Sequence, residues 1–208
     1  MDIPATHGHL EAALRVPRGL TRGAGIVCHP HPLYGGTMNT KAVFRAAQAL
    51  TDVGIVSLRF NFRGVGVSTG SYDEGIGERE DVSEALSWLV KEYPDQPLVA
   101  GGFSFGSMVS LTHAVTDPRV VALFAIGIPI HSYDYTFLKK TDKPTLIVQG
   151  EDDEFGSGSE VESIVRKLGA HLTLVRIPGA DHYFNGHIDE MRLAITAFFH
   201  SGPGKYVL

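Results

Sequence analysis

Apolar residues recur along this chain in two alternating patterns. The first consists of short runs that are rich in β-branched residues and lack polar alternation, as is typical of parallel strands covered on both faces. Six such runs are predicted to form buried strands, at residues 25–28, 54–60, 98–101, 120–128, 145–149 and 172–177.

The second pattern places apolar residues three and four positions apart, which indicates helices with one buried face. It is carried by Val43, Ala46, Ala47 and Leu50, by Val82, Ala85, Leu86 and Leu89, by Val161, Ile164, Val165 and Leu168, and by Ile188, Met191, Ile195 and Phe198. Ser159 and Glu162 have the spacing of a capping box, so we expect the third of these helices to begin there.

In residues 10–16 apolar and polar residues alternate instead with a period of two, which favours an antiparallel edge strand with one solvent-exposed face. Repeated strand–helix units follow, and right-handed crossovers would place helices on both faces of the sheet. We therefore predict an α/β fold, a doubly wound and mostly parallel sheet with an antiparallel N-terminal edge. Since no repeat, low-complexity tract or linker interrupts the chain, residues 1–208 are expected to form one domain.

The composition narrows the class of protein. Apolar residues make up 43% of the 208 residues and charged residues 20%, which are ordinary values for a soluble globular protein. Basic clusters are short and the net charge is -5, which argues against a nucleic-acid or membrane-surface partner. The single cysteine, Cys28, allows no intrachain disulfide. The N-terminus lacks the pattern of a signal peptide and no apolar run approaches the length of a bilayer span, so we expect a cytoplasmic location.

A candidate nucleophile follows the strand predicted at 98–101. The chain there reads Gly102-Phe103-Ser104-Phe105-Gly106 and continues into a predicted helix at 108–115. A strand–turn–helix that contains G-x-S-x-G is a nucleophile elbow, in which side chains at the two glycine positions would collide with the neighbouring strand and helix. Ser104 would then lie at a helix N-terminus, where negative charge is stabilised. The alternative is an ordinary turn of small residues.

A serine nucleophile needs a base, and the base needs an acid that orients it. Acidic residues 151–154 follow the strand predicted at 145–149, and His182 follows the last predicted strand. The order serine, acid, histidine is the one that this architecture requires, with both partners in loops at the carboxyl ends of strands. We assign His182 as the base and Asp153 as the acid, with Asp152 as the alternative. His187 is expected inside the last helix.

The oxyanion of an acyl-transfer reaction needs two backbone donors. One should be the N–H of Phe105, and the other should come from the loop His29-Pro30-His31-Pro32-Leu33-Tyr34-Gly35-Gly36. The prolines have no N–H to give, so Leu33 is the predicted donor, with Tyr34 next. His29 and His31 have a spacing found in metal sites, but no matching carboxylate or cysteine pair accompanies them. We therefore expect no metal and no cofactor.

Together these residues resemble the α/β-hydrolase superfamily, and the resemblance extends over nearly the whole chain. The loop 29–39 is similar to that of a small, lid-less, dienelactone-hydrolase-like group of serine hydrolases, and residues 179–184 are similar to its histidine loop. Residues 59–70 are similar to the loop after the second parallel strand of that superfamily. Within them, Arg63 and Ser68 are interpreted as structural support.

The resemblance implies that an ester is hydrolysed through an acyl-enzyme. Dienelactone hydrolases use a cysteine where this chain has Ser104, so their particular substrate is not expected here. Only residues 129–143 separate two predicted strands, which leaves no room for a cap domain and favours small or exposed acyl esters. The candidate pocket walls are Tyr34, Phe105, Met108, His131 and Tyr183.

Three other functions use the same sequence features. Amide or peptide hydrolysis and acyl transfer would employ the same triad, and a non-catalytic interaction protein could retain the scaffold. The partner that we expect is a small-molecule ester, and a homodimer is the assembly to be tested.

Overall fold

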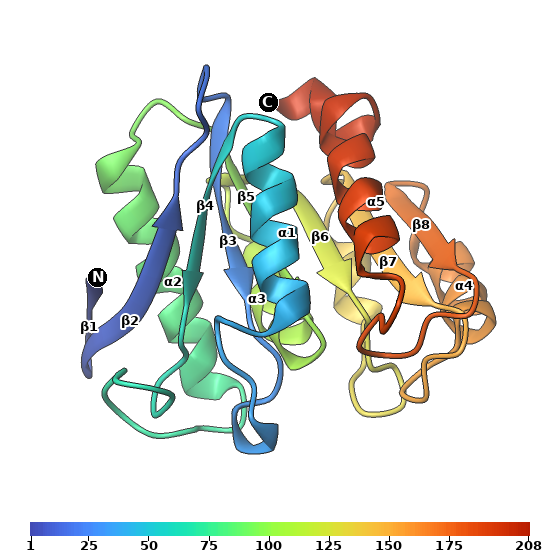
Figure 1. Ribbon diagram of the computed structural model, residues 1–208, viewed down its shortest axis with the longest axis horizontal. Helices are drawn as coiled ribbons and strands as arrows, with labels where there is room; N and C mark the ends of the chain where they lie inside the picture. Colours follow the sequence, from blue (N-terminus) through green and yellow to red (C-terminus); the bar gives the residue numbers. More distant parts are fainter.

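The computed structural model describes residues 1–208, apart from the side chain of Tyr206. Its centre is one eight-stranded sheet in the order β1-β2-β4-β3-β5-β6-β7-β8 (Figure 1). The strands are β1 (Asp2–Ala5), β2 (Gly8–Arg15), β3 (Gly23–Cys28), β4 (Ile55–Phe60), β5 (Leu98–Phe103), β6 (Val120–Ile126), β7 (Thr145–Gly150) and β8 (Leu172–Ile177). The strands from β4 to β8 in this order pair in parallel, so their carboxyl ends lie at one edge of the sheet.

The antiparallel part of the sheet is a hairpin of β1 and β2, and β2 also pairs antiparallel with β4. The predicted fold class is therefore confirmed. The segment predicted to be the edge, however, is the second strand of the sheet, because β1 pairs along its outer side. Ile3 of β1 faces Leu10 of β2, and both side chains are fully buried. A four-residue strand that contains Pro4 is too short to show a period.

Helices cover both faces of the sheet (Figure 1). On one face α1 (Lys41–Asp52) and α5 (Ile188–His200) pack against each other and against the sheet. On the other lie α2 (Ile76–Glu92), α3 (Phe105–Ala114) and α4 (Gly158–Leu168). Two buried apolar clusters fill the two layers, one on each side of the strands.

Three predicted helix starts differ from the structure. Helix α3 begins at Phe105, three residues before the predicted start at residue 108. The capping box of α4 is formed by Ser157 and Glu160, two residues before the predicted pair. Both pairs have the same spacing, but the Glu162 carboxylate binds Arg166 and Arg176 instead. His187 is the N-cap residue of α5 and so precedes the helix in which it was expected.

No cap domain is inserted between β6 and β7 within the described residues, where the connection holds only the short helix η2 (Thr136–Lys140). The described connections at the carboxyl edge of the sheet after β3 and β6 thus contain loops and short helices, without an inserted domain. In the part of the chain that the structure describes, every helix is too short or too polar to cross a bilayer.

Candidate active site

Ser104 occupies a sharp turn between β5 and α3. Its φ of 56° and ψ of -124° lie in a region that non-glycine residues rarely adopt, at a cost of about 1–3 kcal/mol. The flanking glycines make this turn possible. A side chain at Gly102 would overlap the carbonyl of Gly106, and one at Gly106 would overlap the carbonyl of His29. The turn thus presents the Ser104 hydroxyl at the carboxyl edge of the sheet.

The three side chains that were predicted to act together form one hydrogen-bonded chain. Oγ of Ser104 lies 2.9 Å from Nε2 of His182, and Nδ1 of His182 lies 2.8 Å from Oδ2 of Asp153. Because the carboxylate can only accept, Nδ1 carries the proton and Nε2 is free to accept from the serine. Both His182 and Asp153 are buried, which shields the pair from solvent.

Asp153 is the member of the acidic run that reaches His182. Its Oδ2 also accepts from Nε2 of Gln149 at 2.8 Å, and its Oδ1 accepts from the N–H of Phe155 at 2.8 Å. Asp152 is exposed, and Glu151 forms an ion pair with Arg176. The geometry therefore separates two adjacent aspartates that the sequence left as alternatives.

Several neighbours fix the His182 ring. The ring centroids of Phe155 and Phe103 lie 4.6 and 5.0 Å from that of His182. Gly127, with a φ of 55°, passes so close that an added Cβ would lie 3.3 Å from Nδ1 of His182. Sequence reasoning missed Gln149, Phe155 and Gly127. The sequence offers a signal for two of them: Phe155 lies two residues after the predicted acid, and Gly127 directly follows a strand.

A hollow of about 230 Å³ opens beside Ser104. It is lined by Pro30, His31, Tyr34, Gly35, Gly36, Thr40, Ser104, Phe105, Pro129, Ser132, Tyr133, Phe155, His182 and Tyr183. Three of the predicted pocket walls, Tyr34, Phe105 and Tyr183, are therefore part of it.

The other two predicted walls lie elsewhere. Met108 is one helical turn beyond Ser104 and faces α2, where its Cε lies 3.3 Å from the position of a Cβ at Gly75. His131 lines a neighbouring hollow, and its Nε2 lies 3.2 Å from Oε1 of Glu160. Met108 is therefore a packing residue in this structure, since its side chain lies beside the N-cap of α2 and packs against the buried apolar cluster of that face.

The two predicted oxyanion donors differ in what they bind. The N–H of Phe105 has no hydrogen-bond partner among the described residues. The N–H of Leu33 already donates to Nδ1 of His31 at 3.3 Å, and Leu33 is absent from the described lining of the hollow. The N–H of His31, in contrast, has no partner among the described residues, and His31 lines the hollow. The structure thus disfavours Leu33 as a donor.

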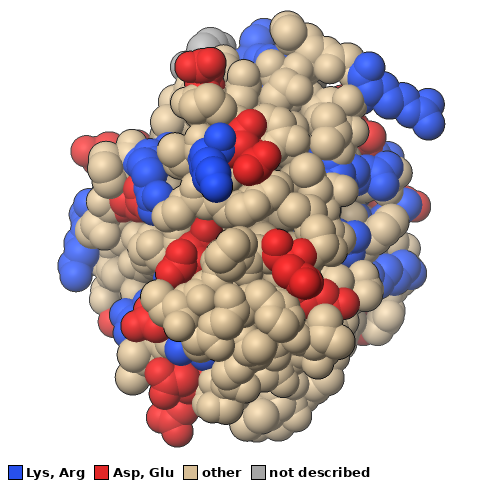
Figure 2. Space-filling model, turned by 90° about the vertical axis from the view of Figure 1, so that its left-hand side faces the viewer, with Lys and Arg blue, Asp and Glu red and all other residues tan. Residues whose placement is uncertain are grey.

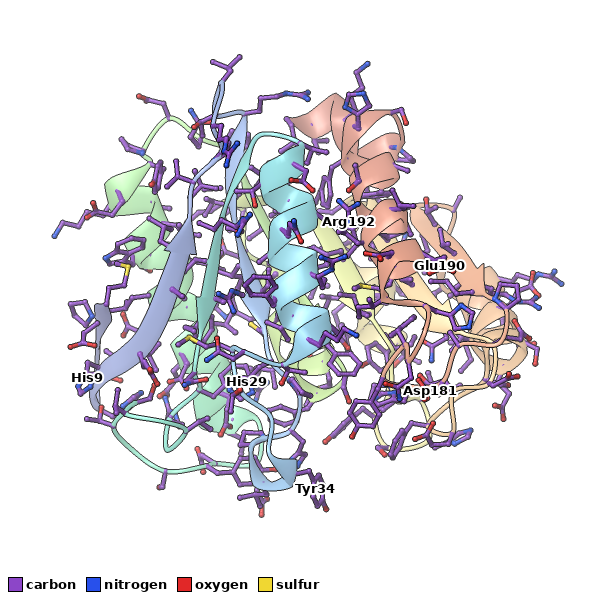
Figure 3. All side chains as sticks on the ribbon, in the orientation of Figure 1. His9, His29, Tyr34, Asp181, Glu190 and Arg192 are labelled. Atoms are coloured by element: carbon purple, nitrogen blue, oxygen red, sulfur yellow. The ribbon has the colours of Figure 1, made fainter. Side chains whose placement is uncertain are left out.

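His29 is a buried structural residue (Figure 3). Its Nδ1 donates to the carbonyl of Pro30 at 2.6 Å, and its Nε2 accepts from the N–H of Phe62 at 3.0 Å. Burial lowers the pKa of His29 to about 4, against the opposing hydrogen bond to Pro30. With both ring nitrogens engaged, none is left for a metal ion, and the described residues contain no cluster of metal-ligating side chains.

Arg63 and Ser68 hold the loop after β4, as predicted. The Arg63 guanidinium binds Asp81 at 2.8 Å and Glu80 at 3.0 Å. The Ser68 hydroxyl donates to the carbonyl of Asn61 at 2.7 Å. Neither residue lines the hollow beside Ser104.

Comparisons with known proteins agree with this architecture. A protein of Rickettsia prowazekii (strain Madrid E), described as uncharacterized, is 38% identical over 190 residues, which is 87% of this chain and 80% of that protein. The structure of an alpha-beta serine hydrolase homologue from Coxiella burnetii is 38% identical, with a TM-score of 0.89 over 94% of each chain. An a/b serine hydrolase without lid from Xanthomonas campestris is 33% identical, with a TM-score of 0.89 over 100% of this chain and 94% of that one.

These likenesses confirm the predicted resemblance to lid-less serine hydrolases. Residues 31–192, which include the candidate nucleophile, acid and base, match the family described as the alpha/beta hydrolase domain. The chain therefore belongs to the alpha/beta hydrolase domain family.

Proposed function

We propose that this protein is a carboxylesterase that cleaves small or exposed acyl esters through an acyl-enzyme on Ser104. One observation carries the proposal. The Ser104 hydroxyl, the His182 ring and the Asp153 carboxylate form an unbroken hydrogen-bonded chain that opens into a hollow. A hydroxyl in this arrangement can lose its proton to the ring as it attacks a carbonyl carbon.

The proposed reaction has two halves. Oγ of Ser104 attacks the ester carbonyl while Nε2 of His182 takes its proton, and Asp153 stabilises the resulting imidazolium. The tetrahedral intermediate collapses, the C–O bond to the alcohol breaks, and His182 returns the proton to the leaving alcohol. Water then attacks the acyl-enzyme with His182 again as base, which releases the acid and restores the serine.

For the oxyanion we propose the N–H groups of Phe105 and His31. Both lack internal partners among the described residues, and both residues line the hollow with Ser104. Phe105 is also the first residue of α3, where the helix dipole favours negative charge. Leu33 is replaced in this role because its N–H is already bound to His31.

A fluorophosphonate probe tests the nucleophile. We expect it to label the wild-type protein and Ser132→Ala, which removes another hydroxyl of the same hollow, but not Ser104→Ala. Equal labelling of Ser104→Ala and wild type would refute the assignment. Absence of any labelling or turnover would instead favour a non-catalytic protein on this scaffold.

Rates with short p-nitrophenyl esters and with an aminoacyl anilide test the leaving group. Among the described residues the carboxyl edge of the sheet has no cap domain, which supports small, exposed esters as substrates. We expect ester rates to exceed the anilide rate, and activity to survive a chelator. A faster anilide reaction would make the protein an amidase. Accumulation of transesterified product in dilute alcohol would make it an acyltransferase.

A further inference from the structure

Three aromatic side chains stand exposed around Ser104. Tyr34 is 83% exposed, Tyr183 53% and Phe155 39%, and all three line the same hollow. They come from separate loops, after β3, β8 and β7 respectively. Tyr34 lies at the tip of its loop, at the same end of the sheet as Asp181 (Figure 3). Large apolar groups that gather at one exposed place commonly mark a binding surface.

Further aromatic rings line the hollow beside these three exposed side chains and form an aromatic wall. The ring centroids of His31 and Tyr34 are 4.6 Å apart, and those of His31 and Phe105 are 4.9 Å apart. Tyr133 continues the wall, with its ring centroid 6.3 Å from that of Phe105. A ligand in the hollow would therefore meet ring faces and edges from several directions. Such rings pair favourably with another aromatic ring at these separations.

The hollow carries no Lys, Arg, Asp or Glu among its described lining residues. Burial raises the pKa of Tyr133 and lowers the pKa of His31, so both are uncharged at neutral pH. Figure 2 shows few charged side chains over the lower right of its face, at the height of the loops that surround the site. An anionic or cationic group in the hollow would lose water without gaining an opposite charge.

We propose that the site selects uncharged esters that carry an aromatic ring, which packs against Tyr34 and Tyr133 while the carbonyl lies at Ser104. This inference rests on the proposed esterase function and names its substrate class. A pocket that is merely hydrophobic would bind a saturated ring at least as well as an aromatic one, because a cyclohexyl group is more hydrophobic than a phenyl group. The aromatic wall should reverse that order.

Two pairs of esters test the proposal, with hydrolysis followed by pH-stat so that no chromophore adds a ring. One pair is ethyl 3-phenylpropanoate and ethyl 3-cyclohexylpropanoate, and the other is 2-phenylethyl acetate and 2-cyclohexylethyl acetate. The ring is separated from the ester group in each, so both members react equally in water. We expect at least one pair to favour phenyl by about tenfold in kcat/KM. A ratio of one or less in both pairs would overturn the proposal.

Variants of Tyr34 test whether this exposed ring causes the preference for phenyl esters. Tyr34→Ala should lower the phenyl preference to about twofold or less, and Tyr34→Phe should keep it, because the ring is retained. Leu20→Ala is the matched control, since Leu20 is 82% exposed on a loop outside the hollow. An unchanged preference in Tyr34→Ala would contradict the assignment to Tyr34.

A charge comparison completes the design. Monoethyl succinate should react at least about tenfold more slowly than ethyl butyrate, because its carboxylate would be desolvated without a partner. Equal rates would refute the selection of uncharged esters. If saturated esters are hydrolysed and Ser104 is labelled without any aromatic preference, this inference fails while the esterase proposal stands. If neither labelling nor hydrolysis occurs, both fail.

Discussion

The two halves of the proposed active site are held in place by different means. On one side, Oδ2 of Asp153 accepts from both His182 and Gln149 at 2.8 Å in a buried environment. On the other side, the loop 29–36 reaches into solvent. Its two histidine rings attach it to the loop after β4, through the N–H of Phe62 at 3.0 Å and the hydroxyl of Tyr72 at 3.1 Å.

This difference has an energetic consequence. Hydrogen bonds to a carboxylate are about twice as strong as those between neutral groups. Asp153 accepts its hydrogen bonds as a carboxylate. The hydrogen bonds of His29 and His31 are between neutral groups, since burial lowers the pKa of both rings. Changes in the acid–base half should therefore abolish the chemistry. Single changes in the loop 29–36 should instead lower kcat by smaller factors.

The largest effect is expected from Asp153→Asn. The amide can no longer hold the proton on Nδ1 of His182, and kcat should fall by about 10⁴ at neutral pH, as in other triads. Asp152→Asn is the control, because the Asp152 side chain is exposed and only its backbone N–H binds Ala180. Steady-state kinetics on one activated ester measure both variants. A similar loss in both would mean that the loop, and not the Asp153 carboxylate, matters.

The next effect concerns the backbone donor. Replacing the amide N–H of residue 31 with an ester oxygen, by incorporating the hydroxy-acid analogue of His31, should lower kcat by about 10²–10³. The same replacement at Leu33 removes only its 3.3 Å bond to His31 and should change kcat far less. Thermal unfolding of both proteins checks that the loop is intact. A larger loss at residue 33 than at residue 31 would restore Leu33 as the donor.

The sequence predicted most of the fold because the parallel strands carry long apolar signals. β8 has the predicted bounds, residues 172–177, but it is the edge strand of the sheet and mostly half-buried, so the prediction that it is buried was wrong. The other five predicted strands differ only at their ends. Strand β1 was missed because four residues show no period. The start of α4 was misplaced because two Ser-x-x-Glu pairs overlap, and only their ion pairs distinguish them.

The site was less predictable than the fold. The order of nucleophile, acid and base follows from topology, so Ser104 and His182 could be placed from sequence alone. The choice between Asp152 and Asp153 depends on which carboxylate meets Gln149 and the N–H of Phe155, and that is a matter of backbone direction. For the same reason the sequence could not show that Leu33 donates to the His31 ring.

A smaller effect, on stability, should follow from the pKa of His29. This pKa is about 4 in the folded protein and about 6.5 when unfolded, because burial disfavours the charged ring. Between these values the unfolded chain binds the proton and the folded protein does not. Stability is therefore complete above pH 6.5 and is lost as pH falls towards 4, by about 3 kcal/mol in total.

The variant His29→Gln tests this pH dependence. Its amide oxygen can still accept from the N–H of Phe62 but does not titrate. Urea unfolding at pH 7 and pH 4.5 should show a smaller loss of stability on acidification for the variant than for the wild type. Parallel losses would assign the acid sensitivity to other groups, such as His113, whose pKa is also lowered by burial.

The smallest effect is expected from Tyr72→Phe, which removes one of the two hydrogen bonds that fix the His31 ring. The remaining bond, from the N–H of Leu33 to Nδ1, and the packing of the ring on Phe105 should keep the loop close to its position. A neutral hydrogen bond is worth about 0.5–1.5 kcal/mol, so kcat should fall by roughly 2- to 10-fold. If the loop only positions the oxyanion donor, KM should change little, whereas Tyr34→Ala should act mainly on KM. A loss of kcat as large as that of Asp153→Asn would show that the two halves of the site are not held independently.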